Sequence, residues 1–264
     1  MKVKLLLDEG APKVPPRLLR EAVRAAGMTV TNRKADFGLV VGGDGRFSRY
    51  GRTEDIPLLF VGVRSKGATG SKAHLAQTTF DELPGVLGRI RDGRYEIVEH
   101  RRLGVLINGR KVGEAFTDVY LERGSESTCI RYTVNVTGPG VNIREAAIGD
   151  GVVVTTQAGA TGYYSYPDRI KGDQMDPAAS ASIGKDEIGI CHVSPTFTER
   201  KGEPGHPLRY TVPWGSRVEI SLFRKADARL YGATDGHAGL RIKMGDRVSI
   251  VAETKAARVI SLQG

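Results

Sequence analysis

The stretch Gly38-Leu-Val-Val-Gly-Gly-Asp-Gly45 decides the fold of the first part of the chain. It is a short apolar run that ends abruptly in glycines, which is typical of a strand buried on both faces of a parallel sheet. Glycines at the carboxyl end of such a strand let backbone N–H groups come close to a phosphate. The stretch therefore predicts a buried strand with a ligand site at its end, next to Asp44.

The segments around this strand fit the same architecture. A helical apolar face and three buried runs alternate along the first part of the chain, and strand, helix and strand in this order favour a parallel α/β sheet. The predicted strands are 3–7, 38–45 and 57–63, and the predicted helices are 15–26 and 80–91.

After Gly93 the pattern changes to short apolar runs separated by glycines, with little helical periodicity. This favours a β-rich second domain, with a boundary near residue 95. Residues 168–187 carry no apolar face and are expected to form a long loop or a short helix. The predicted strands are 95–99, 102–107, 115–121, 130–136, 152–156, 218–222, 228–231 and 247–251.

Composition bounds the class of protein. The 264 residues are 40% hydrophobic, which is enough for a substantial core. The first apolar run is too short for a secretory signal, and no stretch approaches the roughly 20 apolar residues of a membrane span. The two cysteines, Cys129 and Cys191, lack metal-binding spacing. We therefore expect a cytoplasmic protein without a disulfide framework or a structural zinc site.

The formal net charge of +9 favours a polyanionic ligand. Nucleic acid is disfavoured as that ligand, because the basic residues are scattered and no tandem basic helix or aromatic-interleaved strand accompanies them. A solvated surface rich in ion pairs fits the same composition.

Asp44 is the first candidate for chemistry. A carboxylate beside a phosphate site can accept the proton of an attacking hydroxyl or hold Mg²⁺, because phosphoryl transfer depends mainly on positioning and charge neutralisation. The alternative is an ordinary Gly-Asp-Gly turn whose carboxylate bonds only nearby backbone.

Thr117-Asp118 is the second candidate, since an acidic residue there interrupts an apolar strand. A carboxylate in this position can accept hydrogen bonds from both hydroxyls of a ribose or another diol. A solvent-facing Asp on an alternating strand is the competing interpretation.

The third candidate begins at Gly149-Asp150-Gly151, continues as an apolar strand and ends in the turn Gln157-Ala-Gly-Ala-Thr-Gly162. Small residues and hydroxyls after a buried strand leave room for a ligand, with Thr161 available to bind it. Taken alone, the segment is also consistent with a tight connection between strands.

The order of these three segments resembles the NAD kinase family. That family has a GGDGT motif after a strand, an Asn-Glu pair after the change of domain, and a later GDG…STPTGSTAY segment. Here Gly42–Gly45 match the first motif, Thr117-Asp118 stand in place of the pair, and GDGVVVTTQAGATGY, from Gly149 to Tyr163, follows the third. The match runs from residue 36 to about residue 250.

The resemblance implies a Rossmann-like N-terminal α/β domain, residues 1–95 joined by 251–264, and a β-rich, β-sandwich-like domain at 96–250. It implies a kinase that phosphorylates the 2′-hydroxyl of the adenosine ribose of NAD, with ATP or a related donor and Mg²⁺, in a homodimer or homotetramer. Asp44 is then the base; Gly42, Gly43, Gly45 and Arg46 bind phosphate or nucleotide; and Thr117, Asp118, Asp150, Thr161, Gly162 and Tyr163 bind the acceptor.

The departures from the family pattern affect the acceptor. Arg46 replaces the Thr of GGDGT, the Asn-Glu pair has become Thr117-Asp118, and Gln157-Ala158 replace Pro-Thr. The basic loop 64–72 stands where the family has a segment resembling Gly-Arg-Leu-Gly-Phe-Leu, and its Arg64, Lys66 and Lys72 are candidates for another polyanion contact. A basic surface loop is the competing interpretation. A kinase for another nucleoside, polyol or lipid-like alcohol, or a non-catalytic nucleotide-binding protein, are therefore alternatives.

Overall fold

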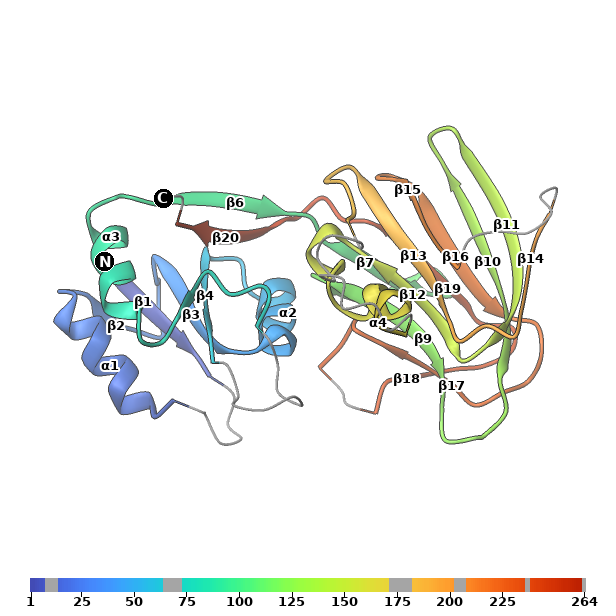
Figure 1. Ribbon diagram of the computed structural model, residues 1–264, viewed down its shortest axis with the longest axis horizontal. Helices are drawn as coiled ribbons and strands as arrows, with labels where there is room; N and C mark the ends of the chain where they lie inside the picture. Colours follow the sequence, from blue (N-terminus) through green and yellow to red (C-terminus); the bar gives the residue numbers. More distant parts are fainter. Residues whose placement is uncertain (8–13, 64–72, 171–181, 202–207, 236–237, 263–264) are drawn as a thin grey trace. The chain divides into compact units, whose positions relative to one another are not determined.

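The computed structural model describes residues 1–7, 14–63, 73–170, 182–201, 208–235 and 238–262. The chain divides into two compact units, which Figure 1 shows with their labelled elements. The N-terminal unit comprises residues 1–100 and 256–264, and the C-terminal unit comprises residues 101–255.

The N-terminal unit is built on a mostly parallel sheet with the order β2-β1-β3-β4-β20-β6, and β5 pairs with β4. β6 runs antiparallel to β20 (Figure 1). β3 is buried along its whole length, as the glycine-bounded apolar run predicts. The strands are β1 (Lys2–Leu6), β2 (Thr29–Val30), β3 (Phe37–Gly42), β4 (Leu58–Gly62), β5 (Thr78–Thr79), β6 (Glu96–His100) and β20 (Ala257–Ser261).

The described residues of this unit also form the helices α1 (Pro16–Ala25), α2 (Asp44–Thr53) and α3 (Leu83–Arg91). α1 buries Leu19 and Val23 in the same core as the strands. α2 follows β3 directly and stacks its Phe47 on Phe60 of β4, with ring centroids 4.6 Å apart. The sequence did not predict α2, because its ten residues bury only Phe47 and Gly51 and therefore carry almost no apolar periodicity.

The C-terminal unit consists of two antiparallel sheets. The first has the order β14-β11-β10-β16-β19-β7-β8 and the second the order β15-β13-β12-β9-β17-β18. Their strands are β7 (Leu103–Ile107), β8 (Arg110–Ala115), β9 (Asp118–Arg123), β10 (Ile130–Gly138), β11 (Val141–Gly149), β12 (Gly151–Thr155), β13 (Glu187–Val193), β14 (Phe197–Arg200), β15 (Arg209–Pro213), β16 (Arg217–Leu222), β17 (Ala228–Tyr231), β18 (Leu240–Ile242) and β19 (Arg247–Ala252).

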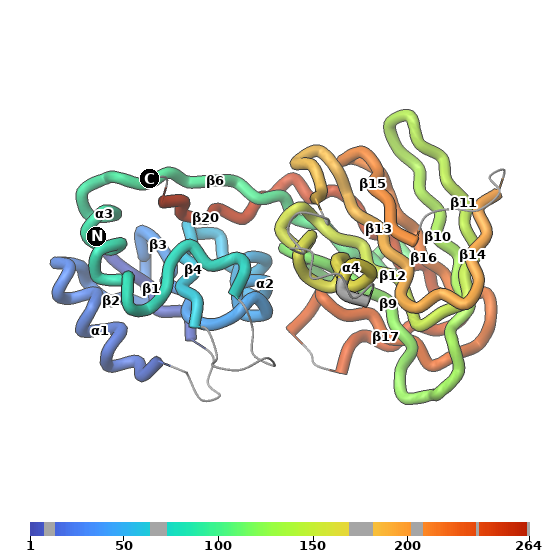
Figure 2. Tube along the Cα trace, viewed as in Figure 1, coloured from blue at the N-terminus to red at the C-terminus, as the bar shows by residue number. Residues whose placement is uncertain are grey.

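One apolar core joins the two sheets. It takes Val134 from β10 and Ile220 from β16 in the first sheet, and Val154 from β12 and Ile188 from β13 in the second. β10 alternates buried and half-buried residues, which is the pattern of a strand with one face on the core. The chain trace in Figure 2 follows these strands from green to orange. The α/β plus β-sandwich-like fold class is confirmed.

Several segments differ from their predicted form. Residues 95–99, expected to open the β-rich domain, form β6 in the first sheet, because they pair with β20. The run 115–121 is split between β8 and β9, with Phe116 and Thr117 between them. Within 168–187, the structure shows the end of a short helix, α4 (Tyr166–Ile170), and residues 171–181 lie outside the described part.

Candidate functional site

The glycine motif of the N-terminal unit is a strand-to-helix junction rather than a free turn. Gly42 ends β3, Gly43 is the extended N-cap residue of α2, and Asp44 is the first residue of that helix. The N-terminus of a helix presents unpaired backbone N–H groups, and an acidic first residue is favourable there. The fold thus places Asp44 at the carboxyl end of a buried parallel strand.

The Asp44 carboxylate accepts two backbone hydrogen bonds. The N–H of His74 donates to Oδ2 at 3.1 Å, and the N–H of Leu75 donates to Oδ1 at 2.9 Å. Hydrogen bonds to an ionised carboxylate are stronger than neutral ones and hold the group in place. The two amides thus hold the Asp44 carboxylate at the strand-to-helix junction.

Arg46 packs against this junction, whereas Gly45 leaves space beside it. Arg46 Nη1 donates to the carbonyl of Val41 at 3.0 Å, and its side chain covers Gly42, where a Cβ would lie 2.5 Å from Arg46 Cδ. A side chain at position 42 would therefore have to displace Arg46. A Cβ on Gly45 would meet no atom within 4 Å. Packing does not require Gly45, so its exposed backbone is open to a ligand.

The Thr117-Asp118 corner of the C-terminal unit is tied to the end of β12. Asp118 lies opposite Thr155 in the sheet, and the Thr117 carbonyl accepts hydrogen bonds from Thr155 Oγ1 at 3.0 Å and from the Thr156 N–H at 2.8 Å. A Cβ on Gly159 would lie 2.2 Å from Thr155 Oγ1. The glycine is thus needed to bring the 157–159 turn against this corner.

Asp118 is a desolvated carboxyl. Burial raises its pKa to about 6, and a hydrogen bond with the Thr117 side chain opposes part of that rise. Oδ2 lies 3.4 Å from where a Cβ of Gly162 would stand, so the small residue makes room beside the acid. At neutral pH this group titrates close to the working range, which is characteristic of functional carboxyls.

Tyrosines gather on the same face of β9. The Tyr120 ring stacks on Tyr231 with centroids 5.2 Å apart and meets the Tyr163 ring edge-on at 5.4 Å. The Tyr163 hydroxyl donates to Glu122. Burial raises the pKa of Tyr120 to about 12 and also raises that of Tyr163, so both hydroxyls stay protonated at neutral pH.

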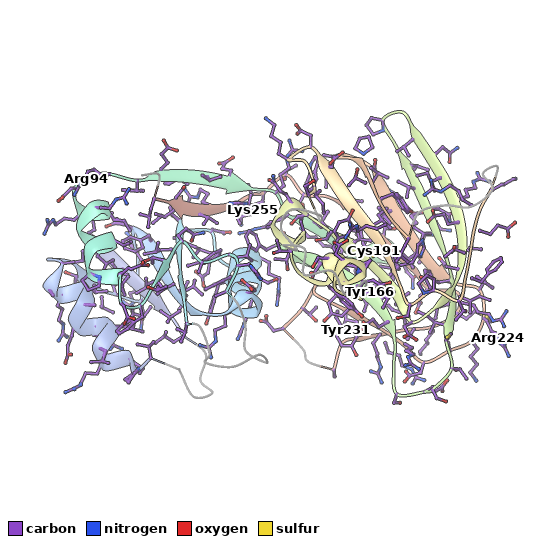
Figure 3. All side chains as sticks on the ribbon, viewed as in Figure 1. Arg94, Tyr166, Cys191, Arg224, Tyr231 and Lys255 are labelled. Atoms are coloured by element: carbon purple, nitrogen blue, oxygen red, sulfur yellow. The ribbon has the colours of Figure 1, made fainter. Side chains whose placement is uncertain are left out.

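A pocket of about 470 Å³ opens beside Tyr163. On its wall Arg123 Nε forms an ion pair with Asp150 Oδ1 at 2.9 Å, in the link between β11 and β12. Tyr166 of α4 also lines it and packs on the apolar cluster around Cys191 (Figure 3). The lining residues are Glu122–Ser127, Asp150, Tyr163, Tyr166, Val193 and Ser194.

The predicted acceptor residues therefore form two groups at opposite ends of β12. Thr117, Asp118 and Gly162 gather at its carboxyl end, and Asp150 stands at its amino end. Tyr163 contacts the Tyr120 ring and lines the same pocket as Asp150. The Thr161 carbonyl accepts the Ser165 hydroxyl at 3.1 Å, in the turn before Tyr163. The loop with Arg64, Lys66 and Lys72 lies outside the described residues.

Sequence reasoning missed Tyr120, Glu122, Arg123 and Tyr231. Tyr120 and Glu122 alternate with buried Val119 and Leu121 along β9, on the side of Asp118. Polar and aromatic residues at every second position after Asp118 were the available signal.

Two further observations concern metals and membranes. Among the described residues, no three or more His, Cys, Asp or Glu side chains gather as a metal-ion cage. No helix in the described part of the chain is long and apolar enough to cross a membrane.

Comparisons with known sequences point to one family. No family model matches the chain. The NAD kinase of Geobacter sulfurreducens is 27% identical over 234 residues, covering 86% of this chain and 73% of that protein. The NAD kinase of Thermoplasma volcanium is 25% identical over 237 residues, covering 90% and 78%.

Solved structures share the fold over nearly the whole chain. Yeast NADH kinase in complex with NADH has a TM-score of 0.71 at 13% identity, covering 98% of this chain and 83% of that one. An NAD kinase from Archaeoglobus fulgidus in complex with ATP has a TM-score of 0.66 at 16% identity, covering 99% and 92%. Similarity along most of the sequence, together with this shared fold, makes the chain a distant member of the NAD kinase family.

Proposed function

We propose that the protein is a kinase that transfers a phosphoryl group from ATP, or a related donor, to the 2′-hydroxyl of the adenosine ribose of NAD, giving NADP. The observation that carries this proposal is the position of Asp44, at the point where a buried parallel strand passes through two glycines into a helix. Ligands of open α/β sheets bind at this edge. The similarity to NAD kinases supplies the reaction.

In this proposal Asp44 is the base for the acceptor hydroxyl. The amides of His74 and Leu75 hold the carboxylate in place before the substrate binds. This lowers the conformational entropy that the carboxylate loses on binding. Gly42, Gly43 and Gly45 bring backbone N–H groups to the phosphates at the start of α2, and Arg46 adds positive charge beside them. The ATP complex of the Archaeoglobus relative supports a nucleotide donor.

The proposed donor is used with Mg²⁺, which would supply positive charge to neutralise the donor phosphates when bound. Mg²⁺ usually keeps several waters and takes only one or two protein carboxylates beside substrate phosphates. The Asp44 carboxylate would be such a ligand, and a cage of protein ligands is not needed.

The acceptor side of the proposal uses the C-terminal unit. Asp118 and Thr117 bind ribose hydroxyls, Gly162 and Thr161 leave room for a base, and Tyr163 provides an aromatic edge. Asp150 binds the polar part of the dinucleotide, held in place by its ion pair with Arg123.

A second acceptor class is favoured by particular contacts. The Glu122–Tyr163 hydrogen bond and the Tyr120–Tyr231 stack fill space and occupy polar groups beside Asp118. These groups favour an acceptor smaller than NAD, such as a nucleoside or polyol. The homodimer or homotetramer and the cytoplasmic location stay predictions.

The experiment is a direct assay of NADP formation from NAD, ATP and Mg²⁺, followed with an NADP-specific dehydrogenase. NADP formation above a no-enzyme control supports the proposal. A parallel panel of nucleosides and polyols, read as ADP release, identifies the second acceptor class. ATP binding without ADP release for any acceptor would indicate a non-catalytic nucleotide-binding protein and overturn the proposal.

A further inference from the structure

A chain of buried polar groups crosses the C-terminal unit beneath the pocket. The Tyr132 hydroxyl of β10 donates to the Gly151 carbonyl at 2.5 Å and lies 2.9 Å from Nδ1 of His192 on β13. His192 Nε2 lies 3.1 Å from Oε2 of Glu145 on β11. Tyr132, His192 and Glu145 are all almost completely buried. We call these three side chains the buried relay.

The number of hydrogens available in the relay determines which ring nitrogens of His192 are protonated. The single Tyr132 hydroxyl hydrogen lies in its bond to the Gly151 carbonyl, which can only accept. The contact between the Tyr132 oxygen and Nδ1 therefore needs a hydrogen on Nδ1. If Nδ1 carried none, two lone pairs would face each other at 2.9 Å.

The other ring nitrogen needs a hydrogen as well. Glu145 Oε1 accepts Arg200 Nη2 at 2.7 Å, and Oε2 accepts the Tyr210 hydroxyl at 2.6 Å. The hydrogen bonds of His192, Tyr210 and Arg200 outweigh burial and lower the pKa of Glu145, so this carboxylate is ionised and only accepts. A contact with Nε2 then requires Nε2–H.

The resulting cation is paired with Glu145, whose carboxylate lies between His192 and Arg200. His192 faces the Glu145 carboxylate directly, and Arg200 on β14 lies on the far side of that carboxylate, over the Tyr210 ring. A buried cation is tolerated when it is paired and fully hydrogen-bonded. Cys191 of β13, Tyr166 and Asp150 act electrostatically on Tyr132, and Arg209 of the neighbouring strand β15 acts on Cys191.

The relay is connected to the pocket through the backbone. Gly151, whose carbonyl Tyr132 holds, follows Asp150, and the Asp150 N–H donates to the Val193 carbonyl at 2.9 Å. The Tyr166 hydroxyl donates to the His192 carbonyl at 2.5 Å and accepts the Ser194 N–H at 3.0 Å. Tyr132 of the relay thus holds the backbone next to Asp150, and Tyr166 holds the backbone at Ser194. Asp150 and Ser194 both line the pocket.

We propose that His192 carries hydrogens on both ring nitrogens, and that through Tyr132 and Glu145 it acts as a positioning residue that fixes the Asp150–Gly151 backbone at the pocket. Its effect on acceptor binding rests on the proposed function. The protonation of His192 and the anchoring of the backbone do not.

The first test is nuclear magnetic resonance of the full chain with ¹⁵N-labelled histidine. His192→Gln assigns the ring signals by their loss. Two N–H signals from His192 at neutral pH are expected, because burial slows their exchange with water. A single ring N–H would overturn the inference, whatever the activity of the protein.

The second test compares Tyr132→Phe with Tyr164→Phe. Both remove one hydroxyl in the same unit, but among the described residues that of Tyr164 makes only a long contact of 3.4 Å, with the Tyr210 carbonyl. In Tyr132→Phe, amide exchange at Asp150 and Gly151 is expected to quicken about tenfold, and NAD is expected to bind about tenfold more weakly with little change in kcat, as for loss of one buried hydrogen bond.

Tyr164→Phe is expected to change neither quantity. Equal exchange at Asp150 and Gly151 in the two variants would contradict the positioning role. Faster exchange in Tyr132→Phe without NAD binding in the wild type would keep that role and refute NAD as the acceptor.

Discussion

The raised pKa of Asp118 predicts that this carboxyl costs the protein stability at neutral pH. Burial favours the neutral acid, and the described contacts supply no cation to offset it. Asp118→Asn keeps the shape and a polar group but cannot ionise. The variant is therefore expected to be more stable than the wild type above the pKa of Asp118.

The size and sign of the effect follow from proton linkage. The folded-state pKa is about 6 against a reference of 3.8, a difference of 2.2. At about 1.4 kcal/mol per unit this gives at most about 3 kcal/mol. Because the folded pKa is raised, the folded state binds the proton more tightly, and stability falls as pH rises from about 4 to about 6. Above that range the full cost is present.

The assay is denaturant unfolding of the C-terminal unit's transition in both proteins from pH 4 to pH 8. Asp118→Asn should gain stability at pH 8, and the gain should shrink toward zero at pH 4. Asp227→Asn is the control with opposite sign, because hydrogen bonds from Ser125 lower the pKa of Asp227. A gain for Asp118→Asn that does not change with pH, or a loss at pH 8, would refute the reasoning.

Three further predictions concern glycines and the pocket. Gly45→Ala should raise helix stability by up to about 1 kcal/mol, because its Cβ meets nothing in the protein. The same methyl group should weaken ATP binding, measured by calorimetry, because it would stand where the proposal places the phosphates. Gly159→Ala should destabilise by about 2–3 kcal/mol through its Thr155 contact, whereas Gly88→Ala in α3 should stabilise by about 0.5–1 kcal/mol; thermal unfolding compares them. Arg123→Ala should change stability by less than about 1 kcal/mol, since the pair is partly exposed, and should raise the acceptor KM.

Much of the fold is visible in the sequence because its strands are continuous apolar runs. The run at 38–45 predicts β3 and its position in a parallel sheet. α2 is not visible, since a polar helix that begins at Asp44 is fixed by its connection to β3 and by one ring stack rather than by an apolar stripe. β6 is assigned by long-range pairing with β20, which local patterns do not contain.

The candidate site was only partly predictable for a similar reason. Motif order singled out Asp44, Asp118 and Asp150, and the structure adds what each carboxylate touches. The two backbone donors at Asp44, the desolvation of Asp118 and the Arg123 partner of Asp150 all depend on residues distant in sequence or on burial. Local sequence therefore indicates which groups are present, and packing determines their chemistry.

The central claim is that Asp44 is the base of a phosphoryl transfer from ATP to NAD. The most direct measurement is NADP formation by the wild type, Asp44→Asn and Asp36→Asn, with ATP binding measured in parallel. Asp36 is the matched control, since its carboxylate also accepts a backbone N–H, that of Lys2 at 2.6 Å. We predict that Asp44→Asn binds ATP but forms NADP at least about a hundredfold more slowly, while Asp36→Asn behaves as the wild type. Equal rates for Asp44→Asn and the wild type would contradict the account.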